Sequence, residues 1–336
     1  MMDSPNAFRL RVRIEFLETP RAMAAKDYRP VLWDAALEDD LRQLLRLAVR
    51  EDLDRHHDWT TGILVADGAA ARAIVAARGP GVVAGMAGAR VALEEYDRRI
   101  EWRPLVEDGA AVEKGTKLAE IAGPARSLLT AERPMLNLLG RLSGIATLTR
   151  QYVDAVAGTK ARIYDTRKTM PGWRRVEKFA VRMGGGSNHR LGLFDGILIK
   201  DNHLAQSAEQ TGAARATPAE AVRRSKAFIA ERLTAEPQLR EFWESMLVEI
   251  EVDRLDQLDL VLPERPDVVL LDNMPPDVLR EAVRRRDAVA PDVELEASGG
   301  INLKTVRAVA ETGVERISCG ALTHSALWWD VGLDWL

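Results

Sequence analysis

The chain has 336 residues, of which 46% are hydrophobic and 29% are charged, and its formal net charge is -4. These proportions are typical of a folded globular protein, and no apolar run approaches the 18 residues of a membrane span. The slight excess of acidic residues argues against a nucleic-acid-binding protein. The only cysteine, Cys319, excludes a disulfide scaffold and indicates a reducing compartment, so we expect a cytoplasmic protein with no membrane or nucleic-acid partner.

The first third of the chain predicts a mixture of helices and strands. Residues 1–34 form an N-terminal extension in which 9–17 alternate polar with apolar side chains, as an edge strand does. Apolar residues at helical spacing around 41–49 predict a helix. Short apolar runs at 72–77 and 81–86 predict strands, and Gly109 and Gly115 predict turns between further short strands. We therefore expect an α+β segment here.

A long helical pattern follows over 127–157, with Pro134 inside it. Proline has no amide hydrogen to donate and clashes with the preceding turn of a helix. We therefore expect Pro134 to lie at the start of a helix or at a break.

From about residue 160 the pattern changes to short β-rich runs that each end in polar residues. These runs lie at 162–165, 197–200, 248–252, 268–272, 294–298 and 316–320. Glu251 and Asp272 are 21 residues apart, Asp272 and Glu296 are 24 apart, and Glu296 and Cys319 are 23 apart. Each spacing is about the length of one strand and one helix with their loops. A helical pattern at 276–289 lies between two of the runs. Alternating strands and helices predict a parallel sheet, and repeated units of this size favour an α/β barrel, whose working residues lie at the carboxyl ends of its strands.

The stretch 205–246 is longer than one such unit requires, and it mixes apolar with many charged residues. We interpret it as added helix that covers the barrel. A lid over the site is the alternative interpretation.

The densest group of chemically active residues lies between Arg162 and His203. Nine basic residues and four acidic residues fall in this segment, a local balance of +5 in a chain whose total is -4. The side chains that adjoin a strand end or a glycine loop are Arg167, Lys168, His189, Arg190 and Lys200. Such cations indicate a small polyanionic ligand. Three other cations, at Arg174, Arg175 and Arg182, fall on a predicted helix over 174–183 and are interpreted as a solvated face.

Three glycine-containing segments follow predicted strands. The triplet at 184–186 precedes His189 and Arg190, and the other two segments are Ser298-Gly299-Gly300 and Ser318-Cys319-Gly320. The last strands of α/β barrels often bind phosphate through backbone amides and a helix N-terminus. The second and third segments therefore predict a phosphate cup, with tight turns as the alternative.

Glu251 and Asp272 end successive strands and are expected to be neighbours. Paired carboxylates in a cationic site suggest Mg²⁺ ligation, binding of ribose hydroxyls or stabilisation of developing positive charge. A role as salt-bridge partners of the cations is the alternative. Cys319 has no histidine placed to activate it and is interpreted as a small buried residue, and His56, His57 and Asp58 are too local a group to predict a metal site.

Several strings of this sequence together resemble the quinolinate phosphoribosyltransferase family. They are ERPMLNLLGRLSGIAT (132–147), DTRKTMPGWR (165–174), GGGSNHRLGL (184–193), LIKDNH (198–203), EIEV (249–252), LLDNM (270–274), EASGGI (296–301) and TGVERISCGALTHS (312–325). The resemblance covers nearly all of 35–330. It departs from the family pattern at Trp173, at Phe179, at His57 and in the stretch 205–246.

The resemblance implies an α/β protein with an incomplete α/β barrel and an α+β N-terminal domain. The implied division is an extension at 1–34, an α+β domain at 35–135 joined by 325–336, and a barrel at 136–324. It also implies transfer of phosphoribosyl from phosphoribosyl pyrophosphate to quinolinate with Mg²⁺, giving nicotinate mononucleotide, CO₂ and pyrophosphate in NAD biosynthesis.

The family's functional residues carry over by motif. The implied quinolinate site contains Arg133, Arg167, His189, Arg190 and Lys200. Arg133 would act across the interface of a homodimer, which in this family also assembles into a hexamer of dimers. The implied catalytic residues are Lys168, Glu251 and Asp272, the last two also as direct or water-mediated metal ligands. The implied phosphoribosyl and phosphate site adds to these three Ser298, Gly299, Gly300, Ser318, Gly320 and His324.

Three other functions fit parts of the pattern. An enzyme of the same fold could use nicotinate or another aromatic monoacid, although so many cations favour a diacid. Lys200 at a strand end could form a Schiff base, as in an aldolase. The third alternative is an anion-binding scaffold without catalysis.

Overall fold

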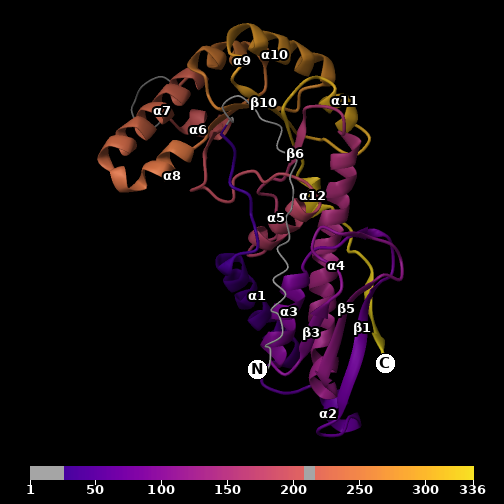
Figure 1. Cartoon of the computed structure of the whole chain (residues 1–336). Helices are drawn as coiled ribbons and strands as arrows, with labels where there is room; N and C mark the ends of the chain where they lie inside the picture. The colour runs from indigo at the N-terminus through magenta and orange to yellow at the C-terminus, as the bar shows by residue number, and fades with distance from the viewer. Residues whose placement is uncertain (1–25, 208–215) are drawn as a thin grey trace, which may run out of the picture.

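The computed structural model describes residues 26–207 and 216–336, and these contain two large β-sheets and a separate two-stranded pair (Figure 1). The strand predicted at 9–17 lies outside the described residues. Of the described helices, none is long and apolar enough to cross a membrane.

The first sheet is antiparallel and has four strands in the order β12-β1-β5-β3. Its strands are β1 (Ala70–Ala77), β3 (Glu101–Pro104), β5 (Lys117–Pro124) and β12 (Val331–Trp335). A two-stranded pair, β2 (Gly81–Val82) with β4 (Ala111–Val112), lies beside it, and the helices of this part are α1 (Ala35–Leu53), α2 (Trp59–Leu64) and α3 (Met86–Tyr96). The predicted strand at 81–86 was too long, because Gly85 adopts a left-handed conformation and α3 begins at Met86.

The second sheet is parallel and has six strands in the order β6-β11-β10-β9-β8-β7. The strands are β6 (Arg162–Tyr164), β7 (Ile197–Ile199), β8 (Val248–Val252), β9 (Val268–Asp272), β10 (Glu294–Ser298) and β11 (Arg316–Ser318). Each of the six predicted runs forms a strand, so the α/β interpretation is confirmed. Because β6 and β7 are the two edges of this sheet, the barrel is incomplete.

Helices follow the strands of this sheet in the chain. They are α5 (Arg174–Met183), α6 (Asp201–Gln206), α7 (Pro218–Ala235), α8 (Arg240–Ser245), α9 (Leu255–Val261), α10 (Pro276–Val289), α11 (Val306–Ala310) and α12 (Ala321–His324), with short 3₁₀ turns η1 (Pro237–Leu239) and η2 (Leu262–Glu264). The described part of the predicted extra helical stretch forms α7, η1 and α8. Val222 and Ile229 of α7 are buried, so this helix packs on the protein.

One long helix, α4 (Ala125–Ala155), connects the two sheets (Figure 1). The prediction that Pro134 lies at a start or break was wrong, because Pro134 lies inside α4. Helix α4 is packed along most of its length, and this burial outweighs the roughly 3 kcal/mol that an internal proline costs. At Gly144 a Cβ atom would lie 2.0 Å from the carbonyl oxygen of Leu327, so glycine lets the C-terminal segment cross α4 closely.

The C-terminal strand returns to the first sheet, where β12 pairs antiparallel with β1. The last strand of the chain therefore lies beside β1, which belongs to the first quarter of the sequence (Figure 1). The division at 35–135, 136–324 and 325–336 stays a prediction, because sheet membership alone does not define which parts fold as a unit.

Candidate active site

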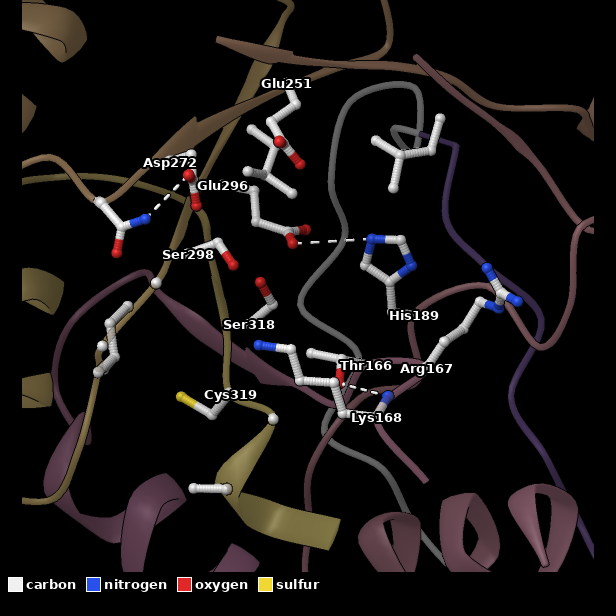
Figure 2. Close-up of a pocket in the computed structure, with 18 of the residues that line it drawn as sticks. Thr166, Arg167, Lys168, His189, Glu251, Asp272, Glu296, Ser298, Ser318 and Cys319 are labelled. Atoms are coloured by element: carbon white, nitrogen blue, oxygen red, sulfur yellow. Dashed lines mark hydrogen bonds and ion pairs between the residues drawn. The ribbon is translucent and has the colours of Figure 1, made fainter. Parts of the chain in front are cut away.

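A cavity of about 820 Å³ opens at the carboxyl ends of the parallel strands. Every predicted site residue except Arg133 lines it, and Figure 2 displays ten of the lining residues with labels. The lining residues that had been predicted are Arg167, Lys168, His189, Arg190, Lys200, Glu251, Asp272, Ser298, Gly299, Gly300, Ser318, Gly320 and His324. The parallel sheet thus gathers residues that are up to 157 positions apart into one pocket.

Arg133 lies elsewhere, exposed on α4, where it borders a smaller apolar cavity together with Leu44 and Trp328. Within one chain it does not reach the main pocket. Its predicted role across a dimer interface stays a prediction.

The cationic wall of the pocket is built from exposed and buried groups. Arg167 and Lys168 are exposed, and the amide of Lys168 donates to Thr166 Oγ1 at 3.0 Å. Arg190 is buried, and its guanidinium donates to the carbonyl oxygen of Gly196 at 3.3 Å. Burial lowers the pKa of Arg190, although an arginine stays charged at neutral pH. Lys200 forms an ion pair with Glu251.

A buried polar lattice holds the loop that carries His189 and Arg190. The ammonium of Lys178 on α5 pairs with Asp165, and both side chains are fully buried. Asn188 donates to Asp165 Oδ2 at 2.7 Å, and the amide of His189 donates to Asp165 Oδ1 at 2.8 Å. Removing one partner of a buried pair typically costs about 3–5 kcal/mol. This lattice therefore determines where the His189 loop lies.

No role for this lattice was predicted from the sequence. Lys178 was counted among the nine cations of 162–203 and Asp165 among the four opposing acids, and Asn188 appeared only within a matching string. The other helix cations are also engaged: Arg175 pairs with Asp40 at 2.7 Å, and Arg174 donates to Thr169 and to the carbonyl oxygen of Leu191. Arg182 is half-buried and donates to the carbonyl oxygen of Gly186 at 3.0 Å. The solvated-face interpretation of that helix was therefore wrong for all three arginines, because other elements pack against it.

The acidic wall is formed by neighbouring strands. Glu251 and Asp272 lie at the ends of the adjacent strands β8 and β9, as predicted, and Ser298 on β10 is the register partner of Asp272. The side-chain amide of Asn273 donates to Asp272 Oδ2 at 2.8 Å, and the backbone amide of Asn273 donates to the carbonyl oxygen of Ser298 at 2.9 Å. These bonds orient the Asp272 carboxylate beside the glycine loop.

The glycine loop after β10 has a conformation that other residues avoid. Gly299 and Gly300 have φ angles of 95° and 61°, in the left-handed region. A Cβ atom on Gly299 would lie 2.2 Å from Asn273 Oδ1. The loop after β11 leads directly into α12, which ends at His324. Both loops therefore present backbone to the pocket, as the predicted phosphate cup requires.

Beneath these walls lies a polar floor that was missed from the sequence. Glu249 and Glu296 are fully buried, and His189 Nε2 lies 3.1 Å from Glu249 Oε2 and 3.7 Å from Glu296 Oε1. Tyr28 stacks on the His189 ring with centroids 4.6 Å apart and donates its hydroxyl to Glu249 at 2.6 Å. A signal existed, because Glu249 and Glu296 each stand two residues before a predicted site residue and so face the same side of their strands.

The acidic pair at the strand ends offers hard oxygen ligands. Mg²⁺ is usually held by one or two carboxylates together with substrate phosphates, and Glu251 and Asp272 border the same pocket as the glycine loops. These residues therefore fit the metal. Lys200 is less suited to a Schiff base, which needs a lysine in an apolar pocket or beside other cations, because its partner is the carboxylate of Glu251. Cys319 is buried, and burial raises the pKa of its thiol to about 12, so it is not a nucleophile at neutral pH.

Two family models match this chain: "Quinolinate phosphoribosyl transferase, N-terminal domain" over residues 58–143 and the corresponding C-terminal domain over 145–334. The chain is 46% identical over 298 residues to the nicotinate-nucleotide pyrophosphorylase [carboxylating] of Mycobacterium leprae, covering 88% of this chain and 97% of that protein. It is 38% identical to a probable enzyme of that name from Bacillus subtilis, covering 77% and 82% of the two chains.

Solved structures agree with these matches. The nicotinate-nucleotide pyrophosphorylase of Francisella tularensis superimposes with a TM-score of 0.79 at 32% identity, covering 92% of this chain and all of that one. NadC of Streptococcus pyogenes superimposes with a TM-score of 0.74 at 32% identity, covering 89% and 98%. Together with the geometry of the pocket, these matches establish that the chain belongs to the quinolinate phosphoribosyltransferase family.

Proposed function

We propose that this pocket transfers phosphoribosyl from phosphoribosyl pyrophosphate to quinolinate and releases CO₂ and pyrophosphate, giving nicotinate mononucleotide for NAD biosynthesis. The observation that carries the proposal is a single cavity with a cationic wall, a carboxylate wall and two glycine loops. The cationic wall suits a small dianion, and the glycine loops suit phosphates. The family membership of the chain supports the same reaction.

In this proposal the pocket has two halves. Arg167, His189, Arg190 and Lys200 surround the two carboxylates of quinolinate. Lys168, Glu251, Asp272, Ser298, Gly299, Gly300, Ser318, Gly320 and His324 surround the phosphorylated ribose. Both groups border one cavity, so the ring nitrogen of quinolinate and the anomeric carbon of the ribose can be brought together without a covalent intermediate.

Charge explains how the two halves would act on the two steps. Departure of pyrophosphate leaves positive charge on the ribose, which Glu251 and Asp272 can stabilise. Attack by the ring nitrogen makes that nitrogen cationic, and its positive charge stabilises the electron pair that remains when the adjacent carboxylate leaves as CO₂. Mg²⁺, held with the substrate by Glu251 and Asp272, would neutralise the pyrophosphate leaving group.

We also propose a homodimer, or a hexamer of such dimers, in which Arg133 of one subunit reaches the pocket of the other. Two observations support this arrangement: Arg133 is exposed, and it lies outside the pocket of its own chain. We also propose that the protein is located in the cytoplasm. The one cysteine of the described structure is unpaired, as is usual in a reducing compartment.

The decisive assay uses purified protein with phosphoribosyl pyrophosphate, Mg²⁺ and either quinolinate or nicotinate. We expect nicotinate mononucleotide and one CO₂ per pyrophosphate from quinolinate, and no turnover of nicotinate. Arg167→Ala should lower kcat/KM for quinolinate by about 10- to 100-fold or more, because charge-assisted hydrogen bonds contribute about 1.5–3 kcal/mol each. Turnover of nicotinate instead of quinolinate would refute the proposal, and full activity of Arg167→Ala would refute the assignment of the cationic wall.

A further inference from the structure

The floor of the pocket contains one carboxyl group with few polar partners. Within the described residues the polar groups nearest to Glu296 are His189, whose Nε2 lies 3.7 Å from Oε1, and the Ser318 hydroxyl, and neither carboxyl oxygen forms a close hydrogen bond although the side chain is fully buried. Glu296 nevertheless lines the main cavity. A buried carboxylate without hydrogen bonds is costly, so such a group is expected to hold a proton.

Its neighbour Glu249 is in the opposite situation. Glu249 accepts a hydrogen bond from Tyr28, and His189 Nε2 lies 3.1 Å from its Oε2 atom. Because Nδ1 of His189 already accepts the amide hydrogen of Arg190 at 2.7 Å, the ring hydrogen is directed from Nε2 toward Glu249. Glu249 therefore has two hydrogen-bond donors directed at its carboxylate, whereas the ring nitrogen of His189 lies 3.7 Å from Glu296.

The surroundings of Glu296 support its protonation. Burial, and next the negative charge of Glu249, raise the pKa of Glu296 to about 7, while His189, Arg316 and Ser318 act in the opposite direction. The titratable and charged groups that face it from the strands, the His189 loop and the N-terminal segment are Tyr28, His189, Glu249, Arg316 and Cys319. Environments that give two neighbouring carboxyl groups different pKa values are typical of acid–base sites.

Glu296 also lies between the two halves of the pocket. Figure 2 displays it at the centre, with His189 on one side and Asp272 and Ser298 on the other. One ligand atom each of His189, Glu249 and Glu296 lie within 4.8 Å of one another, and Ser298 stands two residues further along the strand of Glu296. A neutral carboxylic acid is a hydrogen-bond donor, and Glu296 lines the cavity into which it can donate.

We propose that Glu296 is the general acid that completes decarboxylation, an inference that rests on the function proposed above. The bond between ring carbon 2 and its carboxylate breaks, CO₂ leaves, and the electron pair stays on carbon 2 beside the cationic ring nitrogen. In the same step the O–H proton of Glu296 moves to that carbon and forms the C–H bond of the product, so the release of CO₂ depends on this proton. Glu296 is left as a carboxylate facing Arg316 and His189, and water reprotonates it after the product leaves.

The test separates the two chemical steps in Glu296→Gln, which keeps the size and neutrality of the group but removes its acidity. In a single turnover with quinolinate and phosphoribosyl pyrophosphate, we expect pyrophosphate release near the wild-type rate. CO₂ release should be slower by about 100-fold or more, as is usual when a general acid is lost. N-ribosylated quinolinate should accumulate, detected by mass spectrometry.

Glu294→Gln is the matched control, because Glu294 lies on the same strand face but is paired with Arg316 at 2.5 Å. This control should lower the melting temperature and leave one CO₂ per pyrophosphate. If Glu296→Gln releases CO₂ and pyrophosphate in step, whether both fast or both slowed, the inference is wrong. Wild-type protein that turns over no quinolinate would instead refute the proposed function.

A measurement on the wild-type protein guards against a variant that does not fold. With N-ribosylated quinolinate supplied directly, CO₂ release requires the protonated form of Glu296. Its rate should therefore be constant at low pH and fall about tenfold per pH unit above the pKa of Glu296, which is about 7 before the anionic substrate raises it. A rate that stays constant from pH 6 to 10 would overturn the inference.

Discussion

The ion pairs of the barrel and those of the N-terminal helices differ in what they can do. In the barrel, Lys178–Asp165 is fully buried and holds the loop of His189 and Arg190. Between α1 and α3, Arg42, Arg46 and Arg90 pair with Glu38, Glu94 and Glu95 at a partly exposed surface. Water solvates the second group whether or not its pairs form, whereas the first group has no such alternative. One buried ion pair therefore has larger consequences for stability and for the site than several partly exposed ones.

The largest effect is expected at the buried pair. Lys178→Met leaves the Asp165 carboxylate buried without its cation, and we expect a loss of about 3–5 kcal/mol in the free energy of unfolding. Denaturant titration measures the loss. Lys160→Met is the control, because Lys160 pairs with Glu315 but its side chain is 48% exposed, and this change should lower stability by less than about 1 kcal/mol. Equal losses at both sites would erase the distinction between buried and exposed ion pairs.

The second prediction concerns the exposed cation Arg133, which the proposed dimer would place in a partner's pocket. Arg133→Ala and Arg167→Ala should each lower kcat/KM for quinolinate by about 10- to 100-fold. When the two variants are unfolded and refolded together, random pairing should restore about a quarter of the wild-type activity, because half of the dimers then contain one intact pocket. The absence of any recovery would place Arg133 and Arg167 in the same pocket or Arg133 in none.

The smallest effect is expected at the partly exposed cluster. Arg90→Gln should lower the free energy of unfolding by about 0.2–1 kcal/mol, and the loss should shrink further at 1 M salt, where exposed charges are screened. Turnover of quinolinate should stay unchanged, since Arg90 does not border the pocket. A loss above about 2 kcal/mol would mean that this surface cluster acts like the buried pairs.

Much of the site followed from local patterns. The polar strand ends had to meet, because the carboxyl ends of parallel strands lie at one edge of a sheet. Glu251, Asp272 and Ser298 could therefore be grouped before any coordinates existed. Lys178 could not be separated from its neighbours Arg174 and Arg175, because a helix pattern does not tell which side other elements will cover. Pro134 was misplaced for a related reason, since local preference against an internal proline is weaker than burial of a long helix.

By itself, the sequence determined the class of fold and many of the residues that line the pocket, although not Glu296, because spacing, strand ends and motifs are local properties of the chain. Only the tertiary structure decided which charged groups are buried and with whom they pair. Tyr28 reaches Glu249 across 221 positions, and Glu296 has His189 at 3.7 Å whereas Glu294, two residues earlier, pairs with Arg316 at 2.5 Å. The energy of a buried charge depends on solvent access and on partners from distant segments. Those two quantities arise only when the chain is packed.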